Sequence, residues 1–390
     1  MKKVLIIADS PSTPTGFSQV IHNIFKNLTN KYELIQLGVN YFGDPHEIEW
    51  PIYPASIRGD IWGFSRIPEL VAKKPDLIFI LNDVWVIAKY LKEIKKAYDK
   101  QILPNIVVYF PVDSSEFDPE WFTDFDIVNR AVVYTKFGYD VVRTAVPQME
   151  LDIVPHGINK KHFCKLFRTQ EEKQALKKIL YPDREDFYNS FIVLNRNRNQ
   201  PRKKIDATIE GFAQFAKNKP ENVKLHLHMG LKDAGWDIAK LCRRFGVEER
   251  LIVTNGTRQI QTVPVAKLNL IANASDVGVN TSFGEGWGLC NAEDASVGVP
   301  QIVPDNSASA ELFRDIGLLI PVSLWTRQPD TMTLGGLVSA DGLAQNLEEL
   351  YQQPGLYANL ALLSEEKFKN PIYDWENVSA RFATIFDGVL

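Results

Sequence analysis

Two glutamates, Glu285 and Glu293, carry the strongest chemical signal in this sequence. They flank a segment, 286–289, that holds two glycines and leads into a helical pattern. Glycines let a ligand approach backbone N–H groups, and the amino terminus of a helix attracts negative charge. Eight residues make just over two helical turns, so the second glutamate can reach the far end of a ligand held by the loop. The pattern predicts a phosphate site with a carboxylate at each end.

A basic segment, 195–204, provides the second signal. It follows an apolar run, precedes a helical pattern, and contains two lysines and three arginines. Positive charge at the start of a helix opposes the helix dipole, and such a local conflict is a sign of function. Arginine and lysine at this position suit a clamp on a diphosphate. A solvated basic patch or a nucleic-acid contact is the alternative interpretation.

The glycine loop and its glutamates resemble the E-x7-E signature of the family 4 retaining glycosyltransferases, which have the GT-B fold. In that family the first glutamate contacts the transferred sugar, the loop amides contact the diphosphate, and the second glutamate binds the ribose hydroxyls. The resemblance assigns these roles to Glu285, to the backbone of Gly286, Trp287, Gly288 and Leu289, and to Glu293.

The same resemblance places an arginine and a lysine, five residues apart, on the donor phosphates. Counted back from the helical pattern, these are Arg198 and Lys203. Arg196, Arg202 and Lys204 remain competitors, because the register is open by a residue or two.

Three further positions follow from the resemblance. Gly16, in the loop after the first strand, matches the family's N-terminal glycine loop, although an ordinary strand-to-helix loop is equally consistent. Asp113 stands where many members have a histidine near the sugar, and it either contacts sugar hydroxyls or caps the next segment. The loop 254–257 is expected near the nucleobase. No G-x-G-x-x-G follows the first strand, which counts against a nicotinamide oxidoreductase.

Short apolar runs that alternate with amphipathic stretches must position these residues, and they predict an α/β fold with parallel sheets. The expected strands are 4–8, 34–38, 77–81, 106–110, 131–134, 152–155, 191–195, 224–229, 251–254, 276–280 and 301–303. The expected helices are 18–28, 84–98, 204–217, 265–274, 289–296, 308–314, 356–368 and 375–386.

The resemblance implies two Rossmann-like domains that face an interdomain cleft. We expect an acceptor-side domain over residues 1–168 with 370–390, and a donor domain over 186–369, with the break between 161 and 189. The last helix is expected to return to the first domain through the apolar stripe Trp375, Val378, Phe382 and Ile385.

Composition is that of an ordinary globular protein, with 45% hydrophobic and 24% charged residues among 390. The net charge of −4 gives no reason to expect nucleic-acid binding. Three cysteines without metal-type spacing indicate a reducing compartment, and no apolar run approaches the roughly 20 residues of a membrane span. We therefore expect a cytoplasmic protein, and leave peripheral membrane contact open.

These expectations amount to a retaining, metal-independent hexosyltransferase without a cofactor. Its donor is a GDP- or UDP-sugar, and its acceptor is a glycan, a lipid-linked sugar or a protein. The alternatives are a GT-B phosphorylase or sugar-phosphate synthase, a non-catalytic nucleotide-sugar-binding protein, and a glycosyltransferase acting on modified DNA bases.

Overall fold

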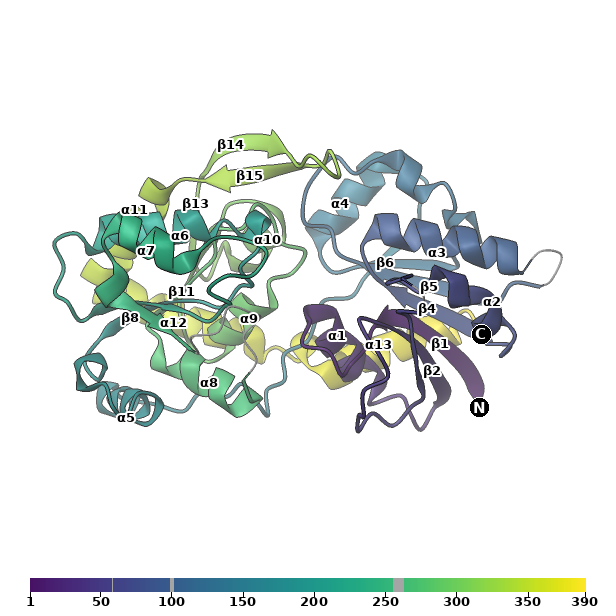
Figure 1. Ribbon diagram of the computed structural model, residues 1–390, viewed down its shortest axis with the longest axis horizontal. Helices are drawn as coiled ribbons and strands as arrows, with labels where there is room; N and C mark the ends of the chain where they lie inside the picture. Colours follow the sequence, from purple (N-terminus) through teal and green to yellow (C-terminus); the bar gives the residue numbers. More distant parts are fainter. Residues whose placement is uncertain (58, 99–101, 255–262) are drawn as a thin grey trace. The chain divides into compact units, whose positions relative to one another are not determined.

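The computed structural model describes residues 1–57, 59–98, 102–254 and 263–390. The chain divides into two compact units (Figure 1). The first unit comprises Met1–Val112, Glu116–Gly157 and Ile372–Leu390, and the second comprises Asp113–Ser115 and Ile158–Pro371. Which unit binds an acceptor and which binds a donor stays a prediction.

The first unit contains a seven-stranded parallel sheet with the order β3-β2-β1-β4-β5-β6-β7. Its strands are β1 (Lys2–Asp9), β2 (Tyr32–Val39), β3 (Ile52–Pro54), β4 (Leu77–Leu81), β5 (Asn105–Phe110), β6 (Arg130–Val133) and β7 (Leu151–Ile153). Six of these lie where apolar runs predict them. The sequence pattern missed β3, which has three residues and ends in a proline.

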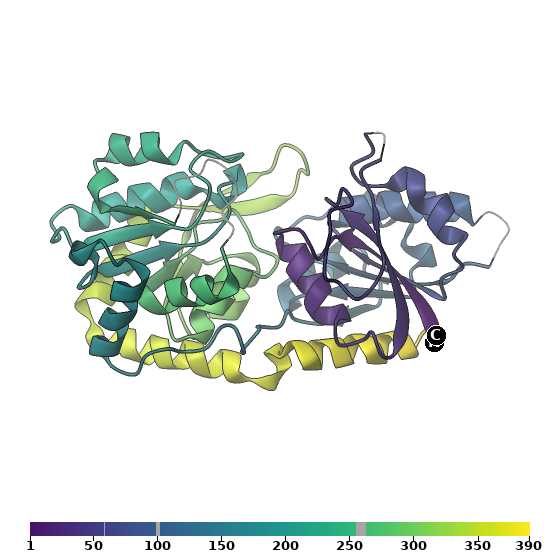
Figure 2. The same cartoon turned by 60° about the horizontal axis from the view of Figure 1, so that its bottom comes forward.

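Helices cover both faces of this sheet (Figures 1 and 2). They are α1 (Gly16–Phe25), α2 (Ile67–Val71), α3 (Val84–Ala97), α4 (Lys136–Ala145) and α13 (Trp375–Asp387). The last helix, α13, packs beside α1: the Phe386 ring lies 6.1 Å from that of Phe25 and 5.7 Å from that of Phe79. Its apolar stripe includes Phe386, which is fully buried, whereas Ile385 is half-buried.

The second unit contains a six-stranded parallel sheet with the order β10-β9-β8-β11-β12-β13. Its strands are β8 (Phe191–Asn195), β9 (Val223–Leu227), β10 (Leu251–Val253), β11 (Val277–Val279), β12 (Gln301–Pro304) and β13 (Leu318–Ile320). A separate antiparallel hairpin, β14 (Val322–Arg327) and β15 (Leu334–Val338), follows the last of them. The predicted α/β class with two parallel sheets is therefore confirmed.

Helices also cover both faces of the second sheet, with α6, α7 and α11 on one and α5, α8, α9 and α12 on the other (Figure 1). Their bounds are α5 (Gln170–Leu180), α6 (Ile205–Ala216), α7 (Ile238–Phe245), α8 (Val265–Ala274), α9 (Leu289–Ser296), α10 (Ser307–Phe313), α11 (Ala340–Gln352) and α12 (Pro354–Lys369). None of the described helices is long and apolar enough to cross a membrane.

One helix, α5, lies within the segment 161–189, where the sequence suggests an interdomain break. It starts with a capping box, in which Thr169 and Glu172 exchange hydrogen bonds with each other's backbone N–H groups. Two of its lysines reach a buried carboxylate: Lys173 Nζ lies 2.8 Å from Asp276 Oδ1, and Lys177 Nζ lies 2.9 Å from Asp276 Oδ2. A buried ion cluster thus joins α5 to the start of β11.

Candidate functional site

The loop between β11 and α9 adopts the strand, loop and helix arrangement predicted from its glycines. Gly288 takes a left-handed conformation, with φ 88°, immediately before α9 begins at Leu289. No described side chain caps the amino terminus of α9. The first N–H groups of such a helix need partners from elsewhere, and an anion can supply them.

Glu285 lies in this loop and is 5% exposed. Its carboxylate accepts hydrogen bonds from Asn280 Nδ2 at 3.0 Å and from Ser282 Oγ at 2.7 Å, and it forms an ion pair with Lys203. Burial alone would raise the pKa of Glu285, but Lys203 and Arg202 hold that pKa at about 2. Glu285 is therefore a buried, ionised carboxylate with a fixed orientation.

The basic segment reaches this glutamate through a short 3₁₀ helix, Pro201–Lys203. Phe283 N donates to Arg202 O at 2.8 Å, which joins the segment to the glutamate loop. Lys203 is 7% exposed and pairs with Glu285, whereas Lys204 Nζ lies 3.2 Å from Asp206. Of the two lysines that the register left open, the structure brings Lys203 to Glu285.

The two arginines nearest β8 differ in their surroundings. The Arg198 side chain is 43% exposed, and its Nε lies 2.7 Å from Asp233 Oδ2. Arg196, one of the competitors in register, is buried and contacts Glu293 and Asp294 on α9. The structure thus pairs the exposed Arg198 with the largely buried carboxylate of Asp233, whereas Lys203 pairs with Glu285, and the role of Arg198 on a diphosphate stays a prediction.

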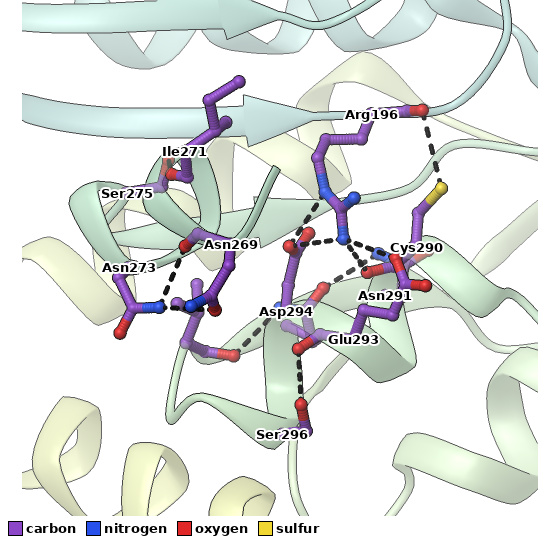
Figure 3. A network of polar contacts seen from close by, with 12 residues as sticks. Arg196, Asn269, Ile271, Asn273, Ser275, Cys290, Asn291, Glu293, Asp294 and Ser296 are labelled. Atoms are coloured by element: carbon purple, nitrogen blue, oxygen red, sulfur yellow. Dashed lines mark hydrogen bonds and ion pairs between the residues drawn. The ribbon is translucent and has the colours of Figure 1, made fainter. Parts of the chain in front are cut away.

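Glu293, the second glutamate of the pair, lies in α9 beside Arg196 (Figure 3). Arg196 Nη2 donates to Glu293 Oε2 at 3.0 Å. Burial raises the pKa of Glu293 to about 7, and the neighbouring Asp294 acts in the same direction, whereas Arg196 opposes them. Its carboxyl is therefore poised to change its charge near neutral pH.

Asp113 belongs to the three-residue segment Asp113–Ser115 of the second unit. Its Oδ2 lies 3.5 Å from Arg202 Nη1, and its carbonyl oxygen would lie 1.8 Å from a Cβ added at Gly284. Ser115 and Leu334 exchange backbone hydrogen bonds of 2.8 and 3.0 Å. Asp113 thus sits next to the glutamate loop, although its role in the reaction stays a prediction.

Comparison with known proteins identifies the fold of this chain through solved structures alone. No family model and no curated protein matches the chain. A solved sucrose-phosphate synthase from Thermosynechococcus elongatus matches with a TM-score of 0.76 and 16% identity, over 100% of this chain and 99% of that chain. Anabaena HepE, solved with UDP and glucose, matches with a TM-score of 0.70 and 15% identity, over 99% and 100%. WaaG, a glycosyltransferase of lipopolysaccharide biosynthesis, matches with a TM-score of 0.66 and 13% identity, over 98% and 99%.

This chain has the GT-B fold. In its first unit, Gly16 opens α1, and Thr15 caps that helix by accepting a hydrogen bond from Ser18 N. The Thr15 hydroxyl also donates to Asp9 Oδ2 at 2.6 Å, so a hydrogen bond between its own side chains ties the loop to the end of β1. A contact of Gly16 with a diphosphate stays a prediction. Of the loop expected near the nucleobase, residues 255–257 lie outside the described part of the chain.

Several polar residues around Glu285 were missed by the sequence pattern. Asn280 and Ser282 bond Glu285 directly, and Ser307 Oγ accepts a 3.0 Å hydrogen bond from Glu285 N. Ser307 has φ 50°, a strained value for a residue other than glycine. Only Asn280, a polar residue at the end of an apolar strand, left a signal that could have been read.

Proposed function

We propose that the chain is a retaining glycosyltransferase that moves a hexose from a nucleoside diphosphate sugar to a hydroxylated acceptor. One observation carries the proposal: a buried, ionised Glu285 is paired with Lys203 directly before the uncapped amino terminus of α9. Positive charge and the amides at the start of a helix suit a leaving diphosphate, and an oriented carboxylate suits the sugar beside it. HepE, of the same fold, was solved with UDP and glucose, which supports a UDP-sugar as the first donor to test.

In this proposal Lys203 and the N–H groups of residues 286–289 stabilise the charge that develops on the departing diphosphate. Arg198 would leave Asp233 to contact the same phosphates. Glu285 would hold the sugar hydroxyls and stabilise positive charge at the anomeric carbon. Glu293 would accept hydrogen bonds from the ribose. No step in this scheme requires a metal ion.

The first test is a panel of UDP- and GDP-sugars without acceptor, with thermal shift and free nucleoside diphosphate as readouts and EDTA present. We expect one donor to stabilise the protein and to be hydrolysed slowly, because water can replace a missing acceptor. Glu285→Gln should retain the thermal shift and lose about 100-fold or more in turnover. Stabilisation without turnover would favour a non-catalytic binding protein, and turnover that requires orthophosphate would favour a phosphorylase.

The raised pKa of Glu293 predicts that nucleotide binding depends on pH. We expect UDP to bind more tightly as the pH rises through about 7, because only the ionised carboxylate can accept hydrogen bonds from both ribose hydroxyls. Calorimetric titrations across this range measure the effect. Glu293→Gln is the control, because it removes this titration and leaves that of the phosphate; an identical pH profile in both proteins would refute the prediction.

A further inference from the structure

Arg196 occupies an unusual environment in the second unit. Its side chain is 2% exposed, and it follows β8 to meet two successive carboxylates of α9 (Figure 3). Arg196 Nε lies 2.9 Å and Nη2 lies 2.8 Å from the same oxygen, Asp294 Oδ1. Two contacts to one oxygen fix the plane of the guanidinium, so Asp294 orients Arg196.

The guanidinium also contacts two other groups of α9. Arg196 Nη2 donates to the backbone carbonyl of Cys290 and to Glu293 Oε2, each at 3.0 Å. The ring of Phe163 lies 5.5 Å from Arg196 Cζ. Arg196 therefore connects the backbone of the first turn of α9 with the side chain of Glu293.

The two oxygens of Glu293 differ. Oε2 is held by Arg196, whereas no described residue donates a hydrogen bond to Oε1. The side chain keeps 12% of its surface exposed. A carboxylate with one oxygen fixed and the other available is oriented for a ligand, because its remaining lone pairs have a set direction.

Charge gives a second argument against a purely structural cluster. One cation faces two buried carboxyl groups, so the group carries a net negative charge whenever both carboxyls are ionised. Buried ion clusters contribute little net stability and are often replaceable by apolar residues. A cluster that leaves one carboxylate uncompensated is better explained by the ligand that this carboxylate binds.

We propose that Arg196, itself oriented by Asp294, is a positioning residue that aims the Glu293 carboxylate at the ribose hydroxyls of the donor. Arg196 acts through Glu293 and does not contact the sugar that is transferred. The inference rests on the proposed function, since it needs a nucleotide at this site. It adds a residue that the E-x7-E pattern does not contain.

The test compares nucleotides with and without a ribose 2′-hydroxyl. UDP and GDP are each titrated against their 2′-deoxy counterparts, and the nucleotide that the wild type binds better is used. Arg196→Lys retains the charge but loses the planar fork. We expect it to weaken binding of the ribonucleotide roughly tenfold and to leave the 2′-deoxy nucleotide nearly unchanged. In turnover, the KM for the donor should rise while kcat changes little.

Asp294→Asn serves as a second variant if Arg196→Lys folds poorly. Its neutral amide holds Arg196 less firmly than the carboxylate does, so we expect the same selective weakening of the ribonucleotide over its 2′-deoxy counterpart, a selectivity that a merely structural role would not produce. Equal weakening of the ribonucleotide and its 2′-deoxy counterpart in Arg196→Lys and in Asp294→Asn overturns the inference alone. A wild-type protein that binds neither UDP nor GDP overturns the proposed function together with it.

Discussion

Replacing Lys203 by Met should lower the free energy of unfolding by about 3–5 kcal/mol, because removal of one partner leaves the other buried and unpaired. Glu285 would retain Asn280 and Ser282 as hydrogen-bond donors, but it would lose the cation that keeps its pKa at about 2. The same variant should lose about 100-fold or more in donor turnover, since Lys203 is the buried positive charge next to the proposed diphosphate. Chemical denaturation and nucleoside diphosphate release measure the two effects.

The double variant Lys203→Met/Glu285→Gln separates stability from chemistry. It replaces both charges by neutral groups of similar size, so most of the lost stability should return while turnover stays low. Lys204→Met is the matched control. Its ammonium pairs with Asp206 and is half-buried, so we expect a change of less than about 1 kcal/mol. If Lys204→Met abolished turnover and Lys203→Met did not, the register of the clamp would be wrong.

Much of the fold could be predicted from the sequence because its signals are local. Continuous apolar runs located β4 and β8 to the residue, since strands covered on both faces contain few polar residues. The pattern missed β13, which has only three residues. The helix α5 and the hairpin β14–β15 could have been found. The first has a capping box at Thr169, and the second has a turn with Pro329 and Asp330 between its strands.

The site was only partly predictable because its polar contacts join segments far apart in the chain. Lys203 and Glu285 are 82 residues apart, and the spacing motifs named both but gave no sign that they pair. Arg196 and Arg198 stand two residues apart in one loop, yet one is buried against α9 and the other is exposed with Asp233. Spacing along the chain cannot decide between them, because the choice depends on which side chain faces α9 after folding.

The buried cluster around Asp276 should be as sensitive as the site itself. Asp276 accepts from Lys173, Lys177 and the N–H of Ile192, at 2.8, 2.9 and 2.8 Å. Burial would raise the pKa of Asp276, but the two lysines outweigh it and keep that pKa below its usual value. The carboxylate therefore stabilises the folded state at pH values above the pKa that Asp276 has in the unfolded chain. This stability is lost as the pH falls through the lower pKa that Asp276 has in the folded protein.

Asp276→Asn leaves two buried ammonium groups without their counter-ion, so we expect a loss of about 3–5 kcal/mol at neutral pH. Glu348→Gln is the control, because it removes an exposed partner of Lys219 and should cost less than about 1 kcal/mol. The loss in Asp276→Asn should shrink as the pH rises towards the ordinary pKa of lysine. Unpaired, buried lysines have a lowered pKa in the folded state, so they are already neutral there at alkaline pH. Once the pH reaches the ordinary pKa of lysine, the unfolded chain loses the same protons and the penalty for burying the charges disappears. Denaturation at neutral and alkaline pH measures this, and a difference that stays constant would mean that the lysines escape to solvent in the variant.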